Sequence, residues 1–93
     1  MNTLRPAAPT VLARAAGGRV LLFECAAGQA LPPHRHTDQT VTVAVLRGNA
    51  LLSVDGVTHD LPAGEVLSVT SAGLFSFQAT QEGTRVLVTL LNH

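Results

Sequence analysis

The sequence predicts an all-β fold in which antiparallel strands form a sandwich or a barrel. Short segments rich in Val, Leu and Thr alternate with turns, and Gly48, Gly56, Gly64, Gly73 and Gly83 recur every eight to ten residues. This spacing fits one strand and one turn per period. Because no segment has a convincing helical pattern, we expect eight or nine strands and no helix.

The first half of the chain begins with a predicted hairpin. Residues 11–14 and 19–25 are rich in β-formers, and Gly17-Gly18 lies between them as the turn. Pro32-Pro33 then imposes an extended path into His34, because proline fixes its own φ and disfavours helix in the residue before it.

The second half continues as a series of short strands. Residues 41–46 alternate β-formers. Asp55-Gly56 separates residues 51–54 from residues 57–61, and this dipeptide predicts a two-residue hairpin turn because both positions favour positive φ. Further strands are expected at residues 66–69, 74–77 and 86–91.

Composition limits what the chain can be. Its 93 residues fit one small domain, which we expect at residues 10–93 after a flexible segment of residues 1–9. A single cysteine excludes an internal disulfide, so a dimer interface or a metal is expected to stabilise the small core. Zero net charge argues against nucleic acid as a partner. No secretory or membrane-spanning segment is evident, so we expect a cytoplasmic protein without a membrane partner.

His34 and His36 are the strongest chemical signal. In an extended strand, residues i and i+2 point to the same face, about 6.5–7 Å apart along the chain. Two imidazoles so placed can converge on one metal ion, although a third or fourth ligand is needed to hold it. The alternative is that both are polar residues at the mouth of a barrel.

These histidines belong to a longer pattern. Gly28, five residues, His34, one residue, His36 and then Gly48 together resemble the first motif of the cupin superfamily, which continues from His-x-His to a Glu and a Gly. Residues 64–77 resemble the second cupin motif, and the whole resemblance spans residues 20–91. It implies a double-stranded β-helix, or jelly-roll, barrel that binds a small molecule and forms a homodimer.

The resemblance also implies a metal site, from which this chain departs. Metal-binding cupins supply two His, a Glu and a second-motif His. The Glu position falls on Thr40 or Val41, and the second-motif His falls on Phe75 or Ser76. Gln39, two residues before Val41, could present its amide oxygen, whereas Asp38, the nearest carboxylate, is expected to point to the opposite face. Only His34 and His36 carry over from the family's ligand set, and Gln39 is added as a candidate third ligand for a divalent metal (Zn, Ni, Fe or Mn).

A neutral ligand set leaves the charge of a divalent ion uncompensated, so we expect weak metal binding that improves when an anionic ligand supplies negative charge. The main hypothesis is a small binding module with this incomplete site. The alternative is a metal-dependent cupin enzyme, dioxygenase-like or isomerase-like. A metal-dependent oxygenase normally completes its two histidines with a carboxylate, which is missing at the expected place.

Several other side chains are expected near the pocket. Val41, Phe75 and Phe77 are expected to form apolar walls, since the interior of a small barrel is both core and pocket. Glu24 alternates with Val20 and Leu22, so it would be a pocket carboxylate if that face points inward. Cys25 is expected to be a small buried hydrophobic residue.

Overall fold

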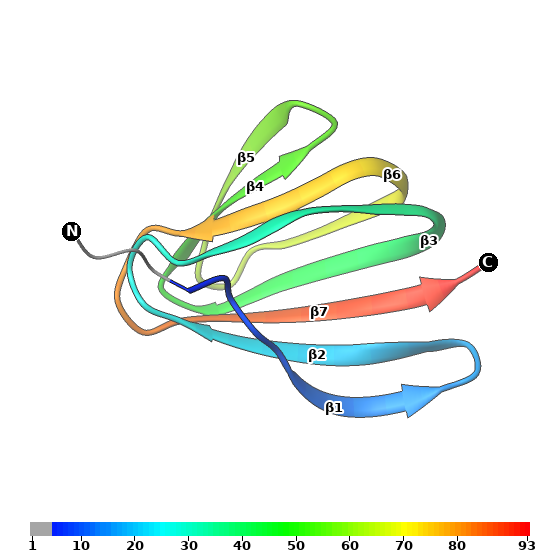
Figure 1. The fold of residues 1–93 in the computed structure, drawn as a ribbon. Coiled ribbons are helices and arrows are strands. Elements are labelled where there is room, and N and C mark those ends of the chain that lie inside the picture. Colours follow the sequence, from blue (N-terminus) through cyan, green and yellow to red (C-terminus); the bar gives the residue numbers. More distant parts are fainter. Residues whose placement is uncertain (1–4) are drawn as a thin grey trace.

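Seven antiparallel strands form the fold in the computed structural model, which describes residues 5–93 (Figure 1). They are β1 (Thr10–Ala15), β2 (Gly18–Cys25), β3 (Ala30–Arg47), β4 (Asn49–Val54), β5 (Val57–Pro62), β6 (Val66–Ala79) and β7 (Thr84–Asn92). Residues 5–93 contain no helix, which confirms the all-β prediction for this part of the chain. None of these residues therefore belongs to a helix that could span a membrane.

The strands lie in the order β1-β2-β7-β3-β6-β4-β5. The two longest strands, β3 and β6, pair from Ala30 opposite Gln78 to Ala44 opposite Val66. They bend as they run, so the sheet curls and the β4–β5 hairpin lies at the opposite side of the molecule from β1 and β2 (Figure 1). The end strands β1 and β5 do not pair with each other. The result is an open jelly-roll barrel.

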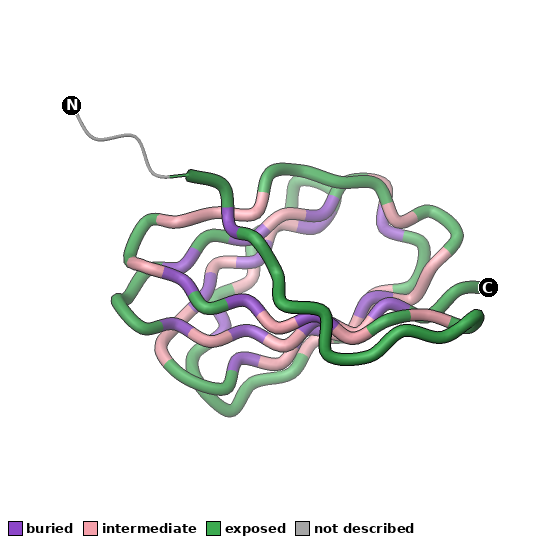
Figure 2. The backbone as a smooth tube through the Cα atoms, turned by 60° about the horizontal axis from the view of Figure 1, so that its bottom comes forward, coloured by how far each residue is buried: buried purple, intermediate pink, exposed green. Residues whose placement is uncertain are grey.

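The core follows the period-two pattern of the strands. Buried residues alternate with half-buried or exposed ones along the chain (Figure 2). Because successive side chains of a strand point to opposite faces, the buried ones share the inner face of the curled sheet. Aromatic packing fills the centre, where the rings of Phe23 and Phe77 meet edge to face at 5.1 Å between centroids. The largest fully buried side chains are Phe23, Phe75, Phe77, Leu52, Leu90, Val41, Val43, Val45, Val86 and Thr84.

Two turns depend on residues that tolerate a positive φ. Asp55 and Gly56 have φ of 48° and 84° and form the two-residue turn predicted between β4 and β5. Gly48 joins β3 to β4 with φ of 78°, and a Cβ there would lie 2.9 Å from Thr84 Cα. Glycine at the end of the first motif therefore serves close packing against β7.

The strand boundaries differ from the prediction in three places. The strand expected at residues 41–46 is the second half of β3, which begins at Ala30. Residues 66–69 and 74–77 belong to one strand, β6, because the bend at Ser71 (φ 58°) shifts the register without ending the pairing with β3. Residues 5–93 therefore form seven strands rather than eight or nine. The turn between β1 and β2 lies at Ala16 and Gly17, one residue earlier than expected, and Arg14 consequently faces Arg19.

The residues before β1 lie against the barrel. Ala7 is buried at 7% exposure, and its N–H donates to the carbonyl of Ala30 at 2.7 Å. The carbonyl of Arg5 accepts a hydrogen bond from Gln29 Nε2 at 3.2 Å. This segment of residues 5–9 thus crosses the start of β3.

Candidate ligand pocket

A cavity of about 370 Å³ opens between the N-terminal segment and the interior of the barrel. Its size is within the range of small-molecule sites. Most of its wall is apolar, Arg19 is its one charged residue, and two histidines supply the remaining polar side chains. The lining residues are Pro6, Ala7, Ala8, Pro9, Arg19, Leu21, Phe23, Leu31, Pro32, His34, His36, Phe75 and Val88.

β3 and β6 bring His34, His36 and Phe75 together. His34 lies opposite Phe75 in the register of the two strands, and the His36 ring packs edge-on against Phe75 with centroids 5.6 Å apart. The two imidazole centroids are 6.4 Å apart. His34 is exposed and His36 is half-buried, so the pair lies at the mouth of the pocket above an apolar floor.

A chain of hydrogen bonds orients His36. Asn92 Nδ2 donates to the carbonyl of Ala16 at 3.1 Å, and Gln39 Nε2 donates to Asn92 Oδ1 at 2.7 Å. Because a carbonyl can only accept, both amides are fixed in this orientation. Gln39 Oε1 therefore accepts from His36 Nδ1 at 2.8 Å, which leaves the lone pair of the neutral ring on Nε2.

The expected site residues lie in three different surroundings. His34, His36 and Phe75 line the pocket, whereas Gln39 lies outside it and contacts it only through His36. Val41 is fully buried within β3 and does not line this cavity. Phe77 packs against Phe23 in the core and also lines a separate, shallower hollow beside β4.

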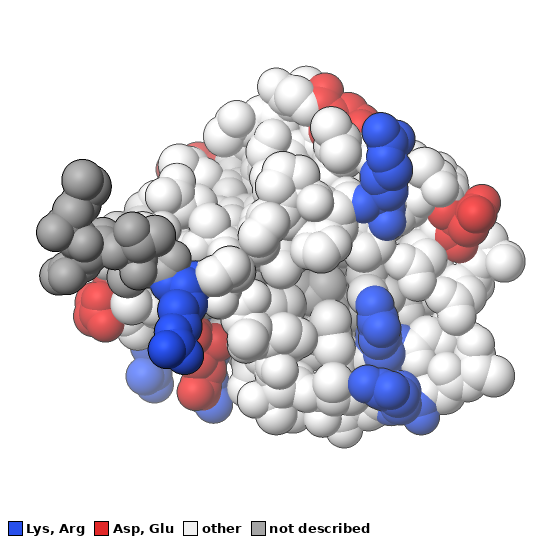
Figure 3. Space-filling view, in the orientation of Figure 1, with Lys and Arg blue, Asp and Glu red and all other residues white. Residues whose placement is uncertain are grey.

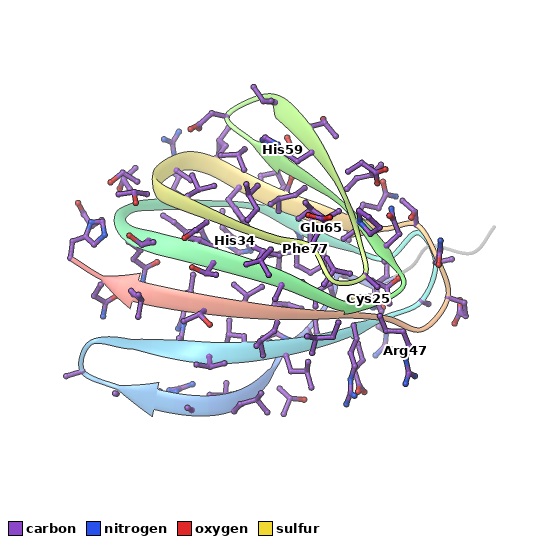
Figure 4. The ribbon with its side chains drawn as sticks, turned by 180° about the vertical axis from the view of Figure 1, so that it is seen from behind. Cys25, His34, Arg47, His59, Glu65 and Phe77 are labelled. Atoms are coloured by element: carbon purple, nitrogen blue, oxygen red, sulfur yellow. The ribbon has the colours of Figure 1, made fainter. Side chains whose placement is uncertain are left out.

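Other polar residues lie away from the pocket. Glu24 points outward and forms an ion pair with Arg85 at 2.9 Å, so the idea of a pocket carboxylate at this position is wrong: Phe23 and Cys25 take the inward positions. Burial raises the pKa of the Cys25 thiol. His59 is half-buried on β5, on the hairpin far from the N-terminal segment (Figure 4).

The side chains present do not suit a metal held by the protein alone. Among residues 5–93, no group of three or more His, Cys, Asp or Glu side chains is placed to share an ion. Two imidazoles on one tetrahedral ion have ring centroids about 5 Å apart, closer than the 6.4 Å seen here. In the same part of the chain, no buried side-chain nitrogen or oxygen lacks a hydrogen-bond partner. Of these four residue types, His34 and His36 are the ones that line the pocket in the described part of the chain.

Sequence reasoning missed Arg19, Asn92 and the N-terminal segment as parts of this region. Asn92 is 53 residues from Gln39, and only the pairing of β3 with β7 brings them together. Arg19 could have been identified from the sequence, because the correct register of the first hairpin would have placed it opposite Arg14. The segment of residues 6–9 has no pattern that predicts contact with the barrel.

The sequence matches a family model described as "Cupin domain" over residues 21–90, which is most of the chain. No curated protein matches it significantly.

Solved structures share the fold. An RmlC-like cupin protein from Desulfovibrio desulfuricans is 24% identical with a TM-score of 0.82, and the match covers 98% of this chain and 91% of that one. A cupin domain from Bordetella pertussis is 23% identical with a TM-score of 0.72, covering 99% of each chain. KdgF from a Halomonas species is 13% identical with a TM-score of 0.83, covering 100% of this chain and 86% of that one.

Proposed function

Because the chain belongs to the cupin family, we propose that it binds a small molecule in the pocket at the mouth of its barrel. The observation that carries this proposal is the cavity of about 370 Å³ whose wall joins His34, His36 and Phe75 to the apolar interior. A mostly apolar cavity with a few convergent polar groups is the usual form of a small-molecule site.

The side chains that line the pocket suggest how a ligand would be bound. Leu21, Phe23 and Val88 offer apolar contact area, and Phe75 adds an aromatic face. Burying apolar ligand surface against them contributes about 25 cal/mol per Å² before the costs of association. The two histidines at the mouth would supply the directional contacts.

His36 has a defined role in this proposal. With Nδ1 donating to Gln39, its Nε2 is an acceptor that can take a hydrogen bond from a hydroxyl or amide of the ligand. His34, which is exposed at the same mouth, would complement it as a second polar contact. Gln39 acts as a positioning residue in this arrangement.

Metal binding is the weaker part of the proposal. With two imidazoles and no carboxylate, the pocket would hold a divalent ion only when an anionic ligand adds oxygen donors. Zn²⁺ or Ni²⁺ binding by untagged protein is therefore expected with a small dicarboxylate and not without it. Absence of uptake in both cases would remove metal binding from the proposal.

The pocket is tested by screening small fragments for binding with saturation-transfer NMR. Wild-type protein is compared with a variant that combines His34→Ala and His36→Ala. Fragments that carry a hydrogen-bonding group on an apolar body are expected to bind the wild type and to lose about tenfold or more in affinity for the double variant.

His59→Ala is the matched control, because it removes the same side chain from β5 outside the pocket. It is expected to bind the same fragments as the wild type. The proposal fails if no fragment binds the folded wild-type protein, or if the double variant and the control bind equally well.

A further inference from the structure

Two arginines face each other on the first hairpin. Arg14 on β1 and Arg19 on β2 are directly opposite in the register, so their side chains lie on the same face. Like charges in this arrangement destabilise a sheet unless an anion lies near them. Among residues 5–93, the ion pair within 4.0 Å is that of Arg85 with Glu24, so neither Arg14 nor Arg19 has an acidic partner there. Figure 3 shows basic side chains close together over the β1–β2 end of one face, with no acidic side chain beside them.

A second pair of facing arginines in the same protein has an acidic residue beside it. Arg47 and Arg85 are also opposite in the register, of β3 and β7. There Glu24 lies opposite Arg85 on the other side and bonds to it at 2.9 Å. The chain thus supplies an acid at one pair of arginines and none at the other, although both pairs are on the same sheet.

The polar groups around Arg14 and Arg19 are mainly donors. Both arginines line a hollow of about 240 Å³ together with Gln39 and Asn92. The side-chain oxygens of both amides already accept hydrogen bonds, from His36 and from Gln39 respectively. Each amide NH₂ uses one hydrogen in the chain that ends at the carbonyl of Ala16, so each retains a second N–H. A surface that offers guanidinium and amide donors is suited to an acceptor-rich anion.

This donor surface lies next to the apolar pocket. Arg19 lines both hollows, and Gln39 bonds to His36 in the pocket wall. We propose that the ligand is a small organic anion whose acidic head lies against Arg14 and Arg19 while its apolar body enters the barrel pocket. This inference rests on the proposed function and adds the charge of the ligand to it.

The test compares acids with neutral analogues of the same shape. Benzoate and hexanoate are titrated into wild-type protein beside benzamide and hexanamide, and binding is followed by saturation-transfer NMR. Phenyl phosphate is included to distinguish a carboxylate from a phosphate head. The acids are expected to bind about tenfold or more tightly than their amides, since hydrogen bonds between charged groups are the stronger ones.

Arg19→Gln is expected to remove this preference for acids over amides, and Arg14→Gln to reduce it. Arg19→Lys should retain part of it, because it keeps the charge without the planar fork. Arg47→Gln is the matched control, because it removes the same charge at the end of β3 (Figure 4), in a separate hollow that Glu24 also lines. It should bind every probe as the wild type does.

The outcomes separate the two proposals. If acids and amides bind equally and Arg19→Gln changes neither, the anion inference is overturned and the pocket stands. If none of these probes binds, the anion inference is overturned, whereas the pocket itself is overturned only if the fragment screen also finds no binder. An equal loss of acid binding in Arg47→Gln would show a nonspecific charge effect and would also overturn the inference.

Discussion

At the scale of single residues, the most informative contact is the one between His36 and Gln39. The carbonyl of Ala16 fixes the direction of the whole hydrogen-bond chain, and this direction decides which nitrogen of His36 carries the proton. A sequence shows the residues of such a chain but not their order in space. Gln39 was expected as a metal ligand, and that expectation remains a prediction. In the proposed site, its contact with His36 makes it a positioning residue.

The first prediction concerns this tautomer. In wild-type protein, neutral His36 is expected to carry its proton on Nδ1, because Gln39 Oε1 accepts it. Gln39→Ala removes the acceptor and should move the proton largely to Nε2. Two-bond ¹⁵N–¹H NMR spectra of the imidazoles measure this directly. The His59 ring serves as an internal control, and an unchanged His36 pattern in the variant would contradict the assignment.

The second prediction concerns Cys25. Burial raises the pKa of its thiol above the ordinary 9.0, so the folded protein holds less reactive thiolate near pH 8 than an exposed cysteine does. Its reaction with a disulfide reagent is expected to be much slower in folded than in urea-unfolded protein. The rate in folded protein should rise as pH approaches the raised pKa. Equal rates in the two states would contradict a buried thiol.

At the scale of elements, hydrogen bonds join the turn of the β4–β5 hairpin to the bend of β6. The Asp55 carboxylate accepts hydrogen bonds from the backbone N–H of Leu74 at 2.7 Å and of Gly73 at 3.3 Å. The Asp55 N–H in turn donates to the carbonyl of Leu74 at 2.8 Å. One residue thus forms the turn and also docks it on the neighbouring strand.

The third prediction follows from this link. Asp55→Ala should lower the free energy of unfolding by about 1–3 kcal/mol, because it removes two charge-assisted bonds and a residue tolerant of positive φ. Asp55→Asn should cost less, since asparagine tolerates the same φ and keeps an acceptor. Urea denaturation measures both. Asp38→Ala, which removes an exposed carboxylate from β3, is the control, and an equal loss in that variant would contradict the account.

The elements were more predictable than the site. Alternating apolar residues predicted the strands on both sides of Asp55-Gly56. Both the alternation and the two-residue turn can be recognised from neighbouring residues alone. The continuity of β6 through Ser71 was not predictable, since it depends on pairing with β3 rather than on local sequence. A one-residue error in the first turn was enough to hide that Arg14 faces Arg19. The geometry of the site depends on how neighbouring strands are aligned, and the amino-acid composition does not determine that alignment.

At the scale of the whole molecule, the sheet has two open edges, formed by the end strands β1 and β5. β1 is an end strand, and all six of its residues are exposed. Val11 and Leu12 on this strand are 42% and 55% exposed. An unpaired edge with apolar side chains favours pairing with another chain. We therefore propose that the protein forms a homodimer through β1.

The fourth prediction tests the dimer by light scattering at micromolar concentration. Wild-type protein is expected to have twice the mass of one chain, and Leu12→Lys to have the mass of a single chain, because a charge on the edge strand opposes pairing. Val66→Lys replaces an equally exposed residue on β6 and should leave the dimer intact. A monomeric wild type, or a dimeric Leu12→Lys variant, would contradict pairing through β1.

The central claim is that the space between residues 6–9 and the barrel interior is a ligand site. Its most direct test is an isotope-filtered NOE experiment on labelled protein with a bound fragment from the screen. The account predicts NOEs from the ligand to the Phe75 ring, the Leu21 and Val88 methyl groups and the imidazoles of His34 and His36. NOEs confined to other surfaces, such as the hollow beside β4, would contradict it.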